Sequence, residues 1–376
     1  MRSILYVTGT RADYGLMRHT LATIDASPNL KLQLLVTGMH MEQKFGNTVA
    51  EIQADNFEIA ALVPTKLSDS SGQSMANAIG EMIVAFTEIM SNNRPDMVLL
   101  LGDRGEMLAG AIAAIHLNIP IAHIHGGERS GTVDEPVRHA ISKLSHFHLV
   151  ATQQANDRLT RMGENPEHIH VVGAPGIDGI HALATWSRNQ LTEELNLDPA
   201  QPVALMVFHP VLQEQKAGAA YTNAIISQLR AKKIQIIALM PNADSGGNEI
   251  LEILREASRL GHVKLATHFQ REKFVSWMAV ADVMIGNSSA GIIEAASFGT
   301  PVINVGNRQN LRERNCNVID TPAEPTAIAK SIETALAIQK FDQYNIYGDG
   351  NTANRIAELL TKFPLDSSVM DKCCAY

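Results

Sequence analysis

The chain has 376 residues, of which 45% are hydrophobic and 19% are charged, a composition that is typical of globular proteins and excludes disordered, fibrous and coiled-coil chains. The length exceeds that of one typical domain, so two domains of similar size are expected. With 31 lysines and arginines against 39 aspartates and glutamates, the net charge is −8, which excludes a general basic surface for nucleic acid or anionic lipid.

The three cysteines, Cys316, Cys373 and Cys374, have no CxxC spacing and cannot all pair with one another. This pattern argues against a disulfide or zinc framework and favours a reducing, cytoplasmic location. The most tempting apolar stretch, residues 108–124, is interrupted by histidines, an asparagine and a proline, so no run approaches the roughly 18 residues that span a bilayer. We therefore expect neither secretion nor membrane insertion.

Short apolar runs, each followed by a segment with helical periodicity, recur along the chain and predict repeated β–α units. Their near-continuous hydrophobicity is typical of parallel strands covered by helices on both faces. The predicted strands are residues 4–8, 32–37, 97–101, 119–124, 149–152 and 170–172 in the first half, and 203–208, 235–239, 264–266, 283–285 and 302–305 in the second. Helices are predicted at residues 74–90 and 352–362, among others.

This rhythm changes once, at a polar helical stretch over residues 178–196 that is followed by two proline dipeptides. We place the domain boundary there, which predicts two doubly wound, Rossmann-like α/β domains, residues 1–177 and 178–351. Open parallel sheets bind ligands at the carboxyl ends of their strands, so two such domains on one linker predict a cleft between these ends. Functional residues are expected directly after strands.

The first predicted strand leads into a turn of small residues at Thr8–Gly15, which begins a helix and contains Arg11. Backbone N–H groups at a helix amino terminus, together with an arginine, suit a phosphate. The turn is neither a GxGxxG dinucleotide fingerprint nor a P-loop, and a plain βα turn with a surface arginine is the alternative.

The strand at residues 97–101 is followed by Asp103 and Arg104. An aspartate just beyond a buried strand is well placed for proton transfer, and the neighbouring arginine can hold it ionised. The structural alternative is a carboxylate that caps a helix amino terminus.

The densest group of polar residues follows the strand at residues 119–124. Residues 123–139 contain three histidines, two glutamates, one aspartate and two arginines around glycines that let the backbone approach a ligand. Alternate strand residues share a face, so His123 and His125 are expected to point the same way. Two hypotheses stay open: a metal site with the HxH pair as ligands, or a metal-free acid/base array.

In the second half, His209 follows the strand at residues 203–208, and His268 follows the strand at residues 264–266. A lone histidine after a strand is more often structural than functional. Residues 286–294 form a more specific pattern, in which a strand ends in small hydroxyl residues and a helix begins. The backbone amides and the hydroxyls there can bind a diphosphate, and the glutamate that follows can accept hydrogen bonds from two ribose hydroxyls.

Several motifs together resemble the hydrolysing UDP-N-acetylglucosamine 2-epimerases of bacterial sialic acid and legionaminic acid synthesis. In chain order these are TGTRADYG, TGMH, GDRGE, HIHGGERSGTVDE, FHP, GNSSAGIIE and VGNRQ, between Ile4 and about Arg314. The resemblance implies the two-domain glycosyltransferase-B architecture, in which the carboxyl-terminal helical segment, residues 352–376, packs back on the first domain. It implies no metal or redox cofactor.

The implied reaction cleaves the sugar C1–oxygen bond with loss of UDP and of the C2 proton, giving a 2-acetamidoglucal. Water then adds to this intermediate and yields a free sugar inverted at C2. UDP-N-acetylglucosamine is the slightly favoured substrate, and a UDP-2,4-diacetamido-2,4,6-trideoxy sugar is the alternative. A homo-oligomer is expected, with neither nucleic acid nor membrane as a partner.

The resemblance also implies site residues. The catalytic residues are Asp103, His125, Glu128, Asp134 and His209. The substrate-binding and UDP-binding residues are Arg11, His40, Arg104, Arg138, His268, Phe269, Ser288, Ser289, Glu294 and Arg308. Many members of the family read HIEGGE where this chain reads HIHGGE, so either His125 or Glu128 takes over the role of the family glutamate.

Three other functions stay open. A glycosyltransferase of the same architecture would use the same UDP-binding residues with an acceptor pocket in the first domain. A metal-dependent hydrolase would use His123, His125 and Glu128 as ligands. A protein that only binds a nucleotide sugar is the third, although the density of carboxylates argues against it.

Overall fold

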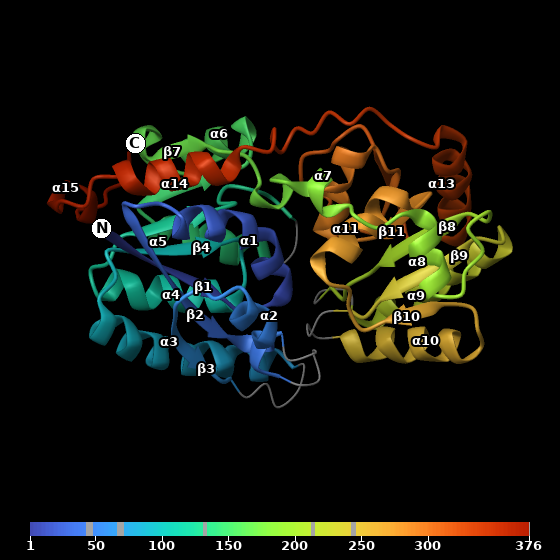
Figure 1. The fold of residues 1–376 in the computed structure, drawn as a ribbon, viewed down its shortest axis with the longest axis horizontal. Helices are drawn as coiled ribbons and strands as arrows, with labels where there is room; N and C mark the ends of the chain where they lie inside the picture. The colour runs from blue at the N-terminus through green and yellow to red at the C-terminus, as the bar shows by residue number, and fades with distance from the viewer. Residues whose placement is uncertain (43–47, 66–70, 131–133, 212–214, 242–245, 376) are drawn as a thin grey trace. The chain divides into compact units, whose positions relative to one another are not determined.

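The structure, a computed structural model, describes residues 1–42, 48–65, 71–130, 134–211, 215–241 and 246–375 (Figure 1). The chain divides into two compact units: unit 1 comprises Met1–Glu128, Val133–Asp178 and Tyr347–Tyr376, and unit 2 comprises Arg129–Thr132 and Gly179–Ile346. Each unit is an α/β fold around one parallel sheet, as the sequence predicts. Among the described residues, no helix is long and apolar enough to cross a membrane.

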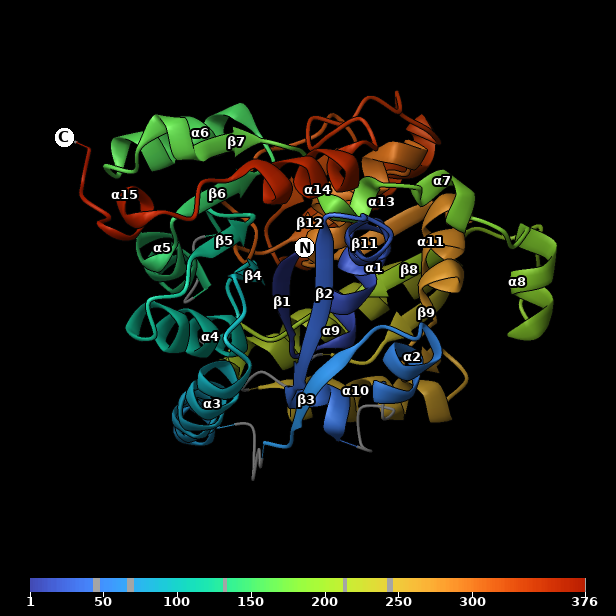
Figure 2. The ribbon, with the colours of Figure 1, turned by 60° about the vertical axis from the view of Figure 1, so that its left-hand side comes forward.

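Unit 1 contains a seven-stranded parallel sheet in the order β3-β2-β1-β4-β5-β6-β7 (Figure 2). Its strands are β1 (Arg2–Thr8), β2 (Leu30–Thr37), β3 (Ile59–Val63), β4 (Met97–Leu101), β5 (Ile121–Ile124), β6 (Phe147–Val150) and β7 (Ile169–Val171). The strand order reverses between β1 and β4. The carboxyl ends of these two strands therefore flank the switch point at which open parallel sheets bind ligands.

Alternate residues of the strands pack on opposite faces of this sheet. Ile4 and Tyr6 of β1 face a core that includes α1 (Arg11–Asp25) and α14 (Thr352–Lys362). Leu5 and Val7 face the other core, which α3 (Gly72–Asn93), α4 (Gly105–His116) and α5 (Asp134–Leu144) cover. The remaining helices of unit 1 are η1 (Gly38–Met41), α2 (Val49–Ala54), α6 (Gln153–Arg161), η3 (Pro166–His168), η4 (Pro175–Ile177) and α15 (Ser367–Met370).

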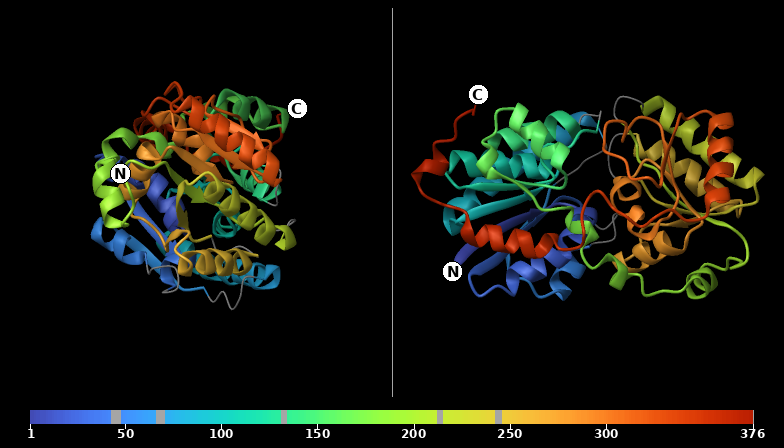
Figure 3. Two further views of the ribbon diagram at one scale, coloured as in Figure 1. Left: turned by 90° about the vertical axis from the view of Figure 1, so that its right-hand side faces the viewer. Right: turned by 90° about the horizontal axis from the view of Figure 1, so that it is seen from above.

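The chain leaves unit 1 and returns to it at neighbouring points. The backbone N–H of Ala174 donates to the carbonyl of Tyr347 at 2.7 Å. The Asp178 carboxylate accepts hydrogen bonds from the backbone N–H groups of Thr352, at 3.0 Å, and Ala353, which begin α14. Figures 1 and 3 show α14, in red, among the blue and green elements of unit 1. A carboxylate on these free N–H groups caps the returning helix.

Unit 2 contains a six-stranded parallel sheet in the order β10-β9-β8-β11-β12-β13. Its strands are β8 (Val203–Val207), β9 (Gln235–Leu239), β10 (Lys264–Ala266), β11 (Val283–Gly286), β12 (Val302–Val305) and β13 (Val318–Thr321). Its helices are α7 (Ile180–Leu183), α8 (Arg188–Glu194), α9 (Gln215–Ala231), α10 (Gly247–Arg259), α11 (Arg271–Val280), α12 (Ser289–Ile293), η6 (Ala295–Phe298) and α13 (Pro325–Ile338). The order reverses between β8 and β11, which places a second switch point there.

Two strands were not expected, one expected helix is divided, and several element ends differ by two or three residues, as in β6 (Phe147–Val150), expected at residues 149–152. The sequence analysis missed β3 and β13, which lie at the edges of the two sheets and are only partly buried. The helical stretch expected over residues 178–196 is two short helices, because α7 ends at Leu183 and α8 begins at Arg188, after the N-cap Ser187, which forms a capping box with Gln190.

Candidate active site

The turn after β1 is held by a buried carboxylate. Thr10 is the N-cap of α1, and its hydroxyl accepts from the Asp13 N–H at 3.2 Å while Asp13 accepts from the Thr10 N–H at 2.7 Å. Burial raises the pKa of Asp13 to about 6, against the lowering effect of hydroxyl donors from Thr8 and Thr10. This capping box fixes Arg11 as the first residue of α1.

Arg11 is partly buried, and this burial lowers its pKa to about 10, which still leaves the guanidinium charged at neutral pH. A cation held at a helix amino terminus, where backbone N–H groups lack partners within the helix, favours an anionic ligand. Arg11 therefore remains a candidate contact for a phosphate.

His40 lies in η1, at the end of β2, and is fully buried. Its Nε2 lies 3.0 Å from the Thr8 hydroxyl, and its Nδ1 lies 2.7 Å from the Thr48 hydroxyl. Burial lowers its pKa to about 4, so the ring is neutral at neutral pH. In this structure His40 braces the turn that carries Arg11.

Asp103 follows β4 and forms an ion pair with Arg138, a nearly fully buried side chain on α5. The N-cap residue of α4 is Arg104, and no side chain caps that position, so the helix-capping alternative for Asp103 is excluded. Arg104 instead lies 3.3 Å from Glu106. The arginine that holds Asp103 therefore comes from a helix 35 residues away in sequence, and not from the neighbouring residue.

His125 and Glu128 form a close hydrogen-bonded pair, Nδ1 to Oε1, and both side chains are buried. The backbone of His125 has a φ of +62°, which is uncommon for a residue other than glycine. Arg138 donates from Nη1 to the His125 carbonyl at 3.0 Å, and the same nitrogen lies 3.8 Å from Glu128 Oε2. Arg138 thus joins Asp103, His125 and Glu128 in one group.

His123 has other hydrogen-bond partners than His125. Its Nε2 donates to the Gly102 carbonyl at 2.7 Å, and its Nδ1 lies 3.1 Å from the Ser142 hydroxyl. Burial lowers its pKa to about 3, so the ring is neutral. The strand ends at Ile124, and the positive φ of His125 breaks the alternation on which the expectation rested.

The HxH metal hypothesis loses its first ligand, because both ring nitrogens of His123 are used by protein atoms. Within the described ranges, no group of three or more histidine, cysteine or acidic side chains is placed to hold a metal ion. Asp134 is the first residue of α5 and lies one helical turn before Arg138, and residues 131–133 before it lie outside the described part of the chain.

In unit 2, Asn287 organises the carboxyl ends of three strands. Its side chain accepts from the His209 N–H at 2.7 Å and donates to the His209 carbonyl at 2.8 Å. Arg308 and Gln309, after β12, both donate to the Asn287 carbonyl at 3.1 Å. Asn287 is almost fully buried and thereby fixes the backbone of His209 and the side chain of Arg308.

Ser288 is the N-cap of α12, and Ser289 is the first residue of that helix. Glu294, directly after α12, is buried and pairs with Arg271 at 2.5 Å. His268 and Phe269 follow the edge strand β10 and are half-buried. The carboxyl ends of β8, β10, β11 and β12 therefore carry the second-half residues that the sequence analysis selected.

The sequence analysis missed several supporting residues. Asn287 stands inside the quoted GNSSAGIIE motif, and its position directly after a strand was the available signal. Asp13 lies in the TGTRADYG motif, where the threonine three residues earlier indicates a capping box. Nothing in the sequence pattern pointed to Arg271 as the partner of Glu294.

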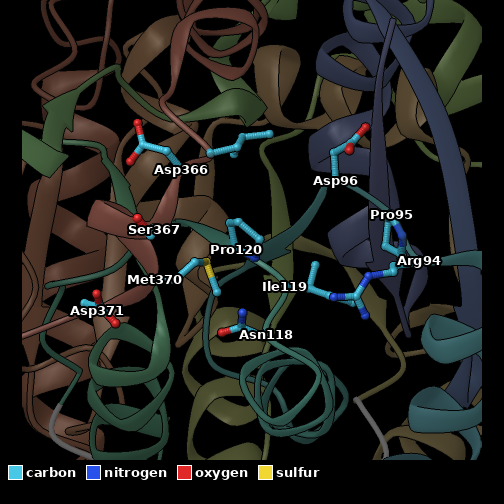
Figure 4. A pocket seen from close by; sticks show the side chains of 11 residues that line it. Arg94, Pro95, Asp96, Asn118, Ile119, Pro120, Asp366, Ser367, Met370 and Asp371 are labelled. Atoms are coloured by element: carbon cyan, nitrogen blue, oxygen red, sulfur yellow. The ribbon is translucent and has the colours of Figure 1, made fainter.

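A pocket lies at the opposite, amino-terminal edge of the unit 1 sheet (Figure 4). Asp96 directly precedes β4, Pro120 directly precedes β5, and Asp366, Met370 and other residues around α15 face them. Parallel sheets bind substrates at the carboxyl edge, and none of the candidate residues lines this pocket. We therefore do not assign the reaction to it.

Comparisons with known proteins identify relatives of the whole chain. The family described as UDP-N-acetylglucosamine 2-epimerase matches residues 22–361. The chain is 50% identical over 376 residues to the UDP-N,N'-diacetylbacillosamine 2-epimerase (hydrolyzing) of Legionella pneumophila. The match covers 100% of both chains. It is 36% identical over 374 residues to the UDP-N-acetylglucosamine 2-epimerase of Neisseria meningitidis. That match covers 96% of this chain and 95% of the relative.

A solved structure shares the fold. The crystal structure of UDP-GlcNAc 2-epimerase from Neisseria meningitidis bound to UDP-GlcNAc matches with a TM-score of 0.81 at 20% identity, and the match covers 96% of this chain and 100% of that one. Two parallel-sheet α/β units of this kind constitute a glycosyltransferase-B-like fold.

Proposed function

The chain belongs to the UDP-N-acetylglucosamine 2-epimerase family, and we propose on that basis that it is a hydrolysing UDP-sugar 2-epimerase. It converts a UDP-2-acetamido sugar and water into UDP and a free sugar that is inverted at C2. The observation that carries this proposal is the group that Arg138 joins at the carboxyl ends of β4 and β5, namely Asp103, His125 and Glu128. Such a group can move protons at two positions of one substrate.

The proposed reaction begins with elimination. Asp103 takes the C2 proton while the C1–oxygen bond breaks, the C1=C2 double bond forms and UDP leaves. The C2 hydrogen beside an acetamido group is only weakly acidic, so its removal needs a positioned base and the departure of a good leaving group in the same event. Addition of a proton at C2 and of water at C1 then gives the free sugar.

The carboxyl edge of the unit 2 sheet is the proposed UDP site. Ser288 and Ser289 offer hydroxyl and amide donors to the diphosphate, and His209 and Arg308 add further donors beside it. Glu294 is proposed to accept from the ribose hydroxyls, and Phe269 with His268 to contact the uracil. Each donor that follows the charge developing on the leaving diphosphate is worth about 3 kcal/mol in barrier height.

For the sugar, we propose a UDP-2,4-diacetamido-2,4,6-trideoxy sugar as the substrate. The support is the relative from Legionella pneumophila, which matches over the full length of both chains at 50% identity and is a UDP-N,N'-diacetylbacillosamine 2-epimerase. The relative from Neisseria meningitidis, at 36% identity, favours UDP-N-acetylglucosamine as the second candidate. The two sugars differ at C4 and C6, where a misplaced hydroxyl buried without a partner costs about 1–3 kcal/mol.

Turnover of both UDP sugars in heavy water tests the proposal. We expect ³¹P NMR to show UDP, and ¹H NMR to show a free 2-acetamido sugar with one solvent deuterium at C2. A product that retains its original C2 hydrogen contradicts the elimination. A kcat/KM that is higher for UDP-N-acetylglucosamine would reverse the choice of sugar and leave the reaction unchanged.

A further inference from the structure

We propose that His125 delivers the new C2 proton in the second half of this reaction, through its Nε2 atom, and that Glu128 is a positioning residue that acts only through His125. This inference rests on the proposed function, because it assigns one of the two proton transfers in that reaction. It also decides between the two residues that the sequence leaves as alternatives at this position.

The first argument is the direction of the imidazole ring. Nδ1 of His125 is bound closely to Oε1 of Glu128, so a carboxylate acceptor holds the proton on Nδ1. Within the described part of the chain, the other ring nitrogen, Nε2, has no hydrogen-bond partner. One ring nitrogen is thus anchored, and the other is left for the substrate and for exchange with solvent.

The second argument is the backbone that carries the ring. His125 has a φ of +62°, a conformation that a residue with a Cβ atom adopts only when its surroundings hold it there. Its N–H donates to the Leu149 carbonyl at 3.1 Å, and its carbonyl accepts from Arg138 at 3.0 Å. The fold thus fixes the backbone on both sides and fixes the ring through Glu128.

The third argument separates the two proton transfers. Inversion at C2 removes a proton from one face of the sugar and adds one to the other, so one carboxylate cannot do both. Asp103 forms an ion pair with the Arg138 guanidinium, and a carboxylate is a proton acceptor, which suits the removal step. His125 pairs with a carboxylate that balances the charge of an imidazolium, which suits the delivery of a proton.

The proposed step balances as follows. The Nε2–H bond of the imidazolium breaks, and its proton forms the new C–H bond at C2 of the 2-acetamidoglucal, using the electron pair of the C1=C2 double bond. The cation that remains at C1 takes the oxygen of a water molecule, which then releases a proton to solvent. His125 regains a proton from solvent, so the hydrogen added at C2 comes from water.

The test separates UDP release from hydration in heavy water, with His125→Gly as the main variant. Glycine adopts a positive φ without strain, so this change removes the ring and keeps the backbone. We expect His125→Gly to release UDP and to accumulate 2-acetamidoglucal, with hydration of that intermediate reduced by roughly 100-fold or more. Added imidazole should restore part of the lost hydration.

Asn118→Gly is the matched control, since Asn118 also has a positive φ, +57°, and lies at the opposite edge of the unit 1 sheet. It should hydrate the intermediate at the wild-type rate and should not respond to imidazole. His125→Asn, in which the new residue also tolerates this backbone conformation, replaces His125→Gly if that variant fails to fold. Far-UV circular dichroism, which senses the secondary structure of both units, confirms that each variant is folded.

Glu128→Gln tests the positioning role. Glutamine can still accept the Nδ1 hydrogen bond but cannot balance the charge of an imidazolium, so the fall of hydration with rising pH should move to lower pH. A purely structural role would lower the rate without moving this limb and would overturn the assignment of Glu128.

Two results distinguish the possible failures. If wild-type protein forms no free sugar with deuterium at C2, the proposed function is wrong. If wild-type protein does form it but His125→Gly hydrates 2-acetamidoglucal at the wild-type rate, or loses UDP release and hydration together, the role of His125 is wrong.

Discussion

Asn287 shows how one amide can organise a binding surface. Its side chain forms two hydrogen bonds with the backbone of His209, as a neighbouring strand would. Its backbone carbonyl accepts hydrogen bonds from the side chains of Arg308 and Gln309. The geometry of the proposed diphosphate site therefore depends on a residue that need not contact the ligand.

We expect Asn287→Asp to weaken UDP binding by at least about tenfold, which is 1.4 kcal/mol. The carboxylate keeps the acceptor for the His209 N–H but loses the donor to the His209 carbonyl, and a buried polar group left unpaired costs about 1–3 kcal/mol. Titration calorimetry with UDP measures this. Asn248→Asp, at an exposed position of α10, is the matched control, and equal affinities of the two variants would contradict the role of Asn287.

The division of labour between the two groups predicts opposite effects of two variants. Asp103→Asn should lose turnover by at least roughly 100-fold with little change in UDP affinity, because an amide cannot take the C2 proton. Glu294→Ala should mainly weaken nucleotide binding. Asp349→Asn removes an exposed ion pair with Arg355 and should change neither quantity. Equal losses of UDP affinity in Asp103→Asn and Glu294→Ala would refute the division.

Exhaustive chelation with EDTA should leave turnover unchanged. The reason is the use of both His123 nitrogens by Gly102 and Ser142, which removes this histidine from any metal site. Turnover before and after dialysis against EDTA measures the effect. Loss of activity that zinc or manganese restores would put the metal-dependent hydrolase first.

The sequence predicts which residues belong to the candidate site, but it does not predict which residues they contact. The motifs select Asp103, His125 and Glu128, but they pair Asp103 with Arg104, whereas the fold supplies Arg138 from α5. That contact depends on where α5 packs against β4 and β5, which no local pattern records. The positive φ of His125 is also hard to predict, since only a small share of histidines adopt it.

At the scale of elements, the hydrophobic runs predict the central strands and the edge strands β7 and β10, but they miss the edge strands β3 and β13. The strand Met97–Leu101 is buried at every residue, so its sequence is uniformly apolar. In the edge strand β3 only Val63 is buried, so the segment IAALV stands out less from its neighbours in the sequence than a central strand does. Complete burial thus makes a strand such as β4 easy to predict from its sequence.

The tail after α14 is anchored by a buried ionic group. Glu164, nearly fully buried, lies 2.6 Å from Lys372, 2.7 Å from Lys143 and 2.9 Å from His148. Lys372 also donates to the carbonyls of Ser142 and Lys143, at 3.2 and 2.8 Å, near the end of α5. Removing the cationic partners of a buried carboxylate costs folding free energy, because the remaining charge is then buried without a partner.

This group predicts a pH dependence of stability. Burial alone raises the pKa of Glu164, but hydrogen bonds from His148, Lys143 and Lys372 lower it to about 2, below the 4.5 of a free glutamate. A lowered pKa contributes stability above pH 4.5 that is lost as the pH falls from 4.5 to 2, on the order of 3 kcal/mol. Urea unfolding of wild type and Glu164→Gln over this range measures it. Parallel pH curves for the two proteins would contradict the prediction.

At the scale of the whole molecule, the chain repeats one architecture twice, with separate cores. Both tryptophans, Trp186 and Trp277, belong to unit 2, so tryptophan fluorescence reports the unfolding of that unit alone. If unit 2 binds UDP as proposed, UDP at 100 times its Kd should stabilise the fluorescent transition by about 2.7 kcal/mol.

Thermal unfolding followed by fluorescence, with and without UDP, measures this shift. Asp103→Asn should retain it, because Asp103 belongs to unit 1, and Asn287→Asp should lose most of it at the same UDP concentration. A fluorescence transition that does not respond to UDP in the wild type would place the nucleotide elsewhere.

The return of the chain to unit 1 has a consequence for synthesis on the ribosome. Asp178 caps α14, whose residues Ile356 and Leu360 fill the same core as Tyr6 and Met17. The 174 residues from Asp178 to Thr352 must be translated before that helix exists, which takes about 10–35 s at typical rates. The amino-terminal unit, first to emerge, is therefore expected to finish folding last. Until then its apolar face is open to aggregation and to chaperones, while unit 2 can already assemble its own core.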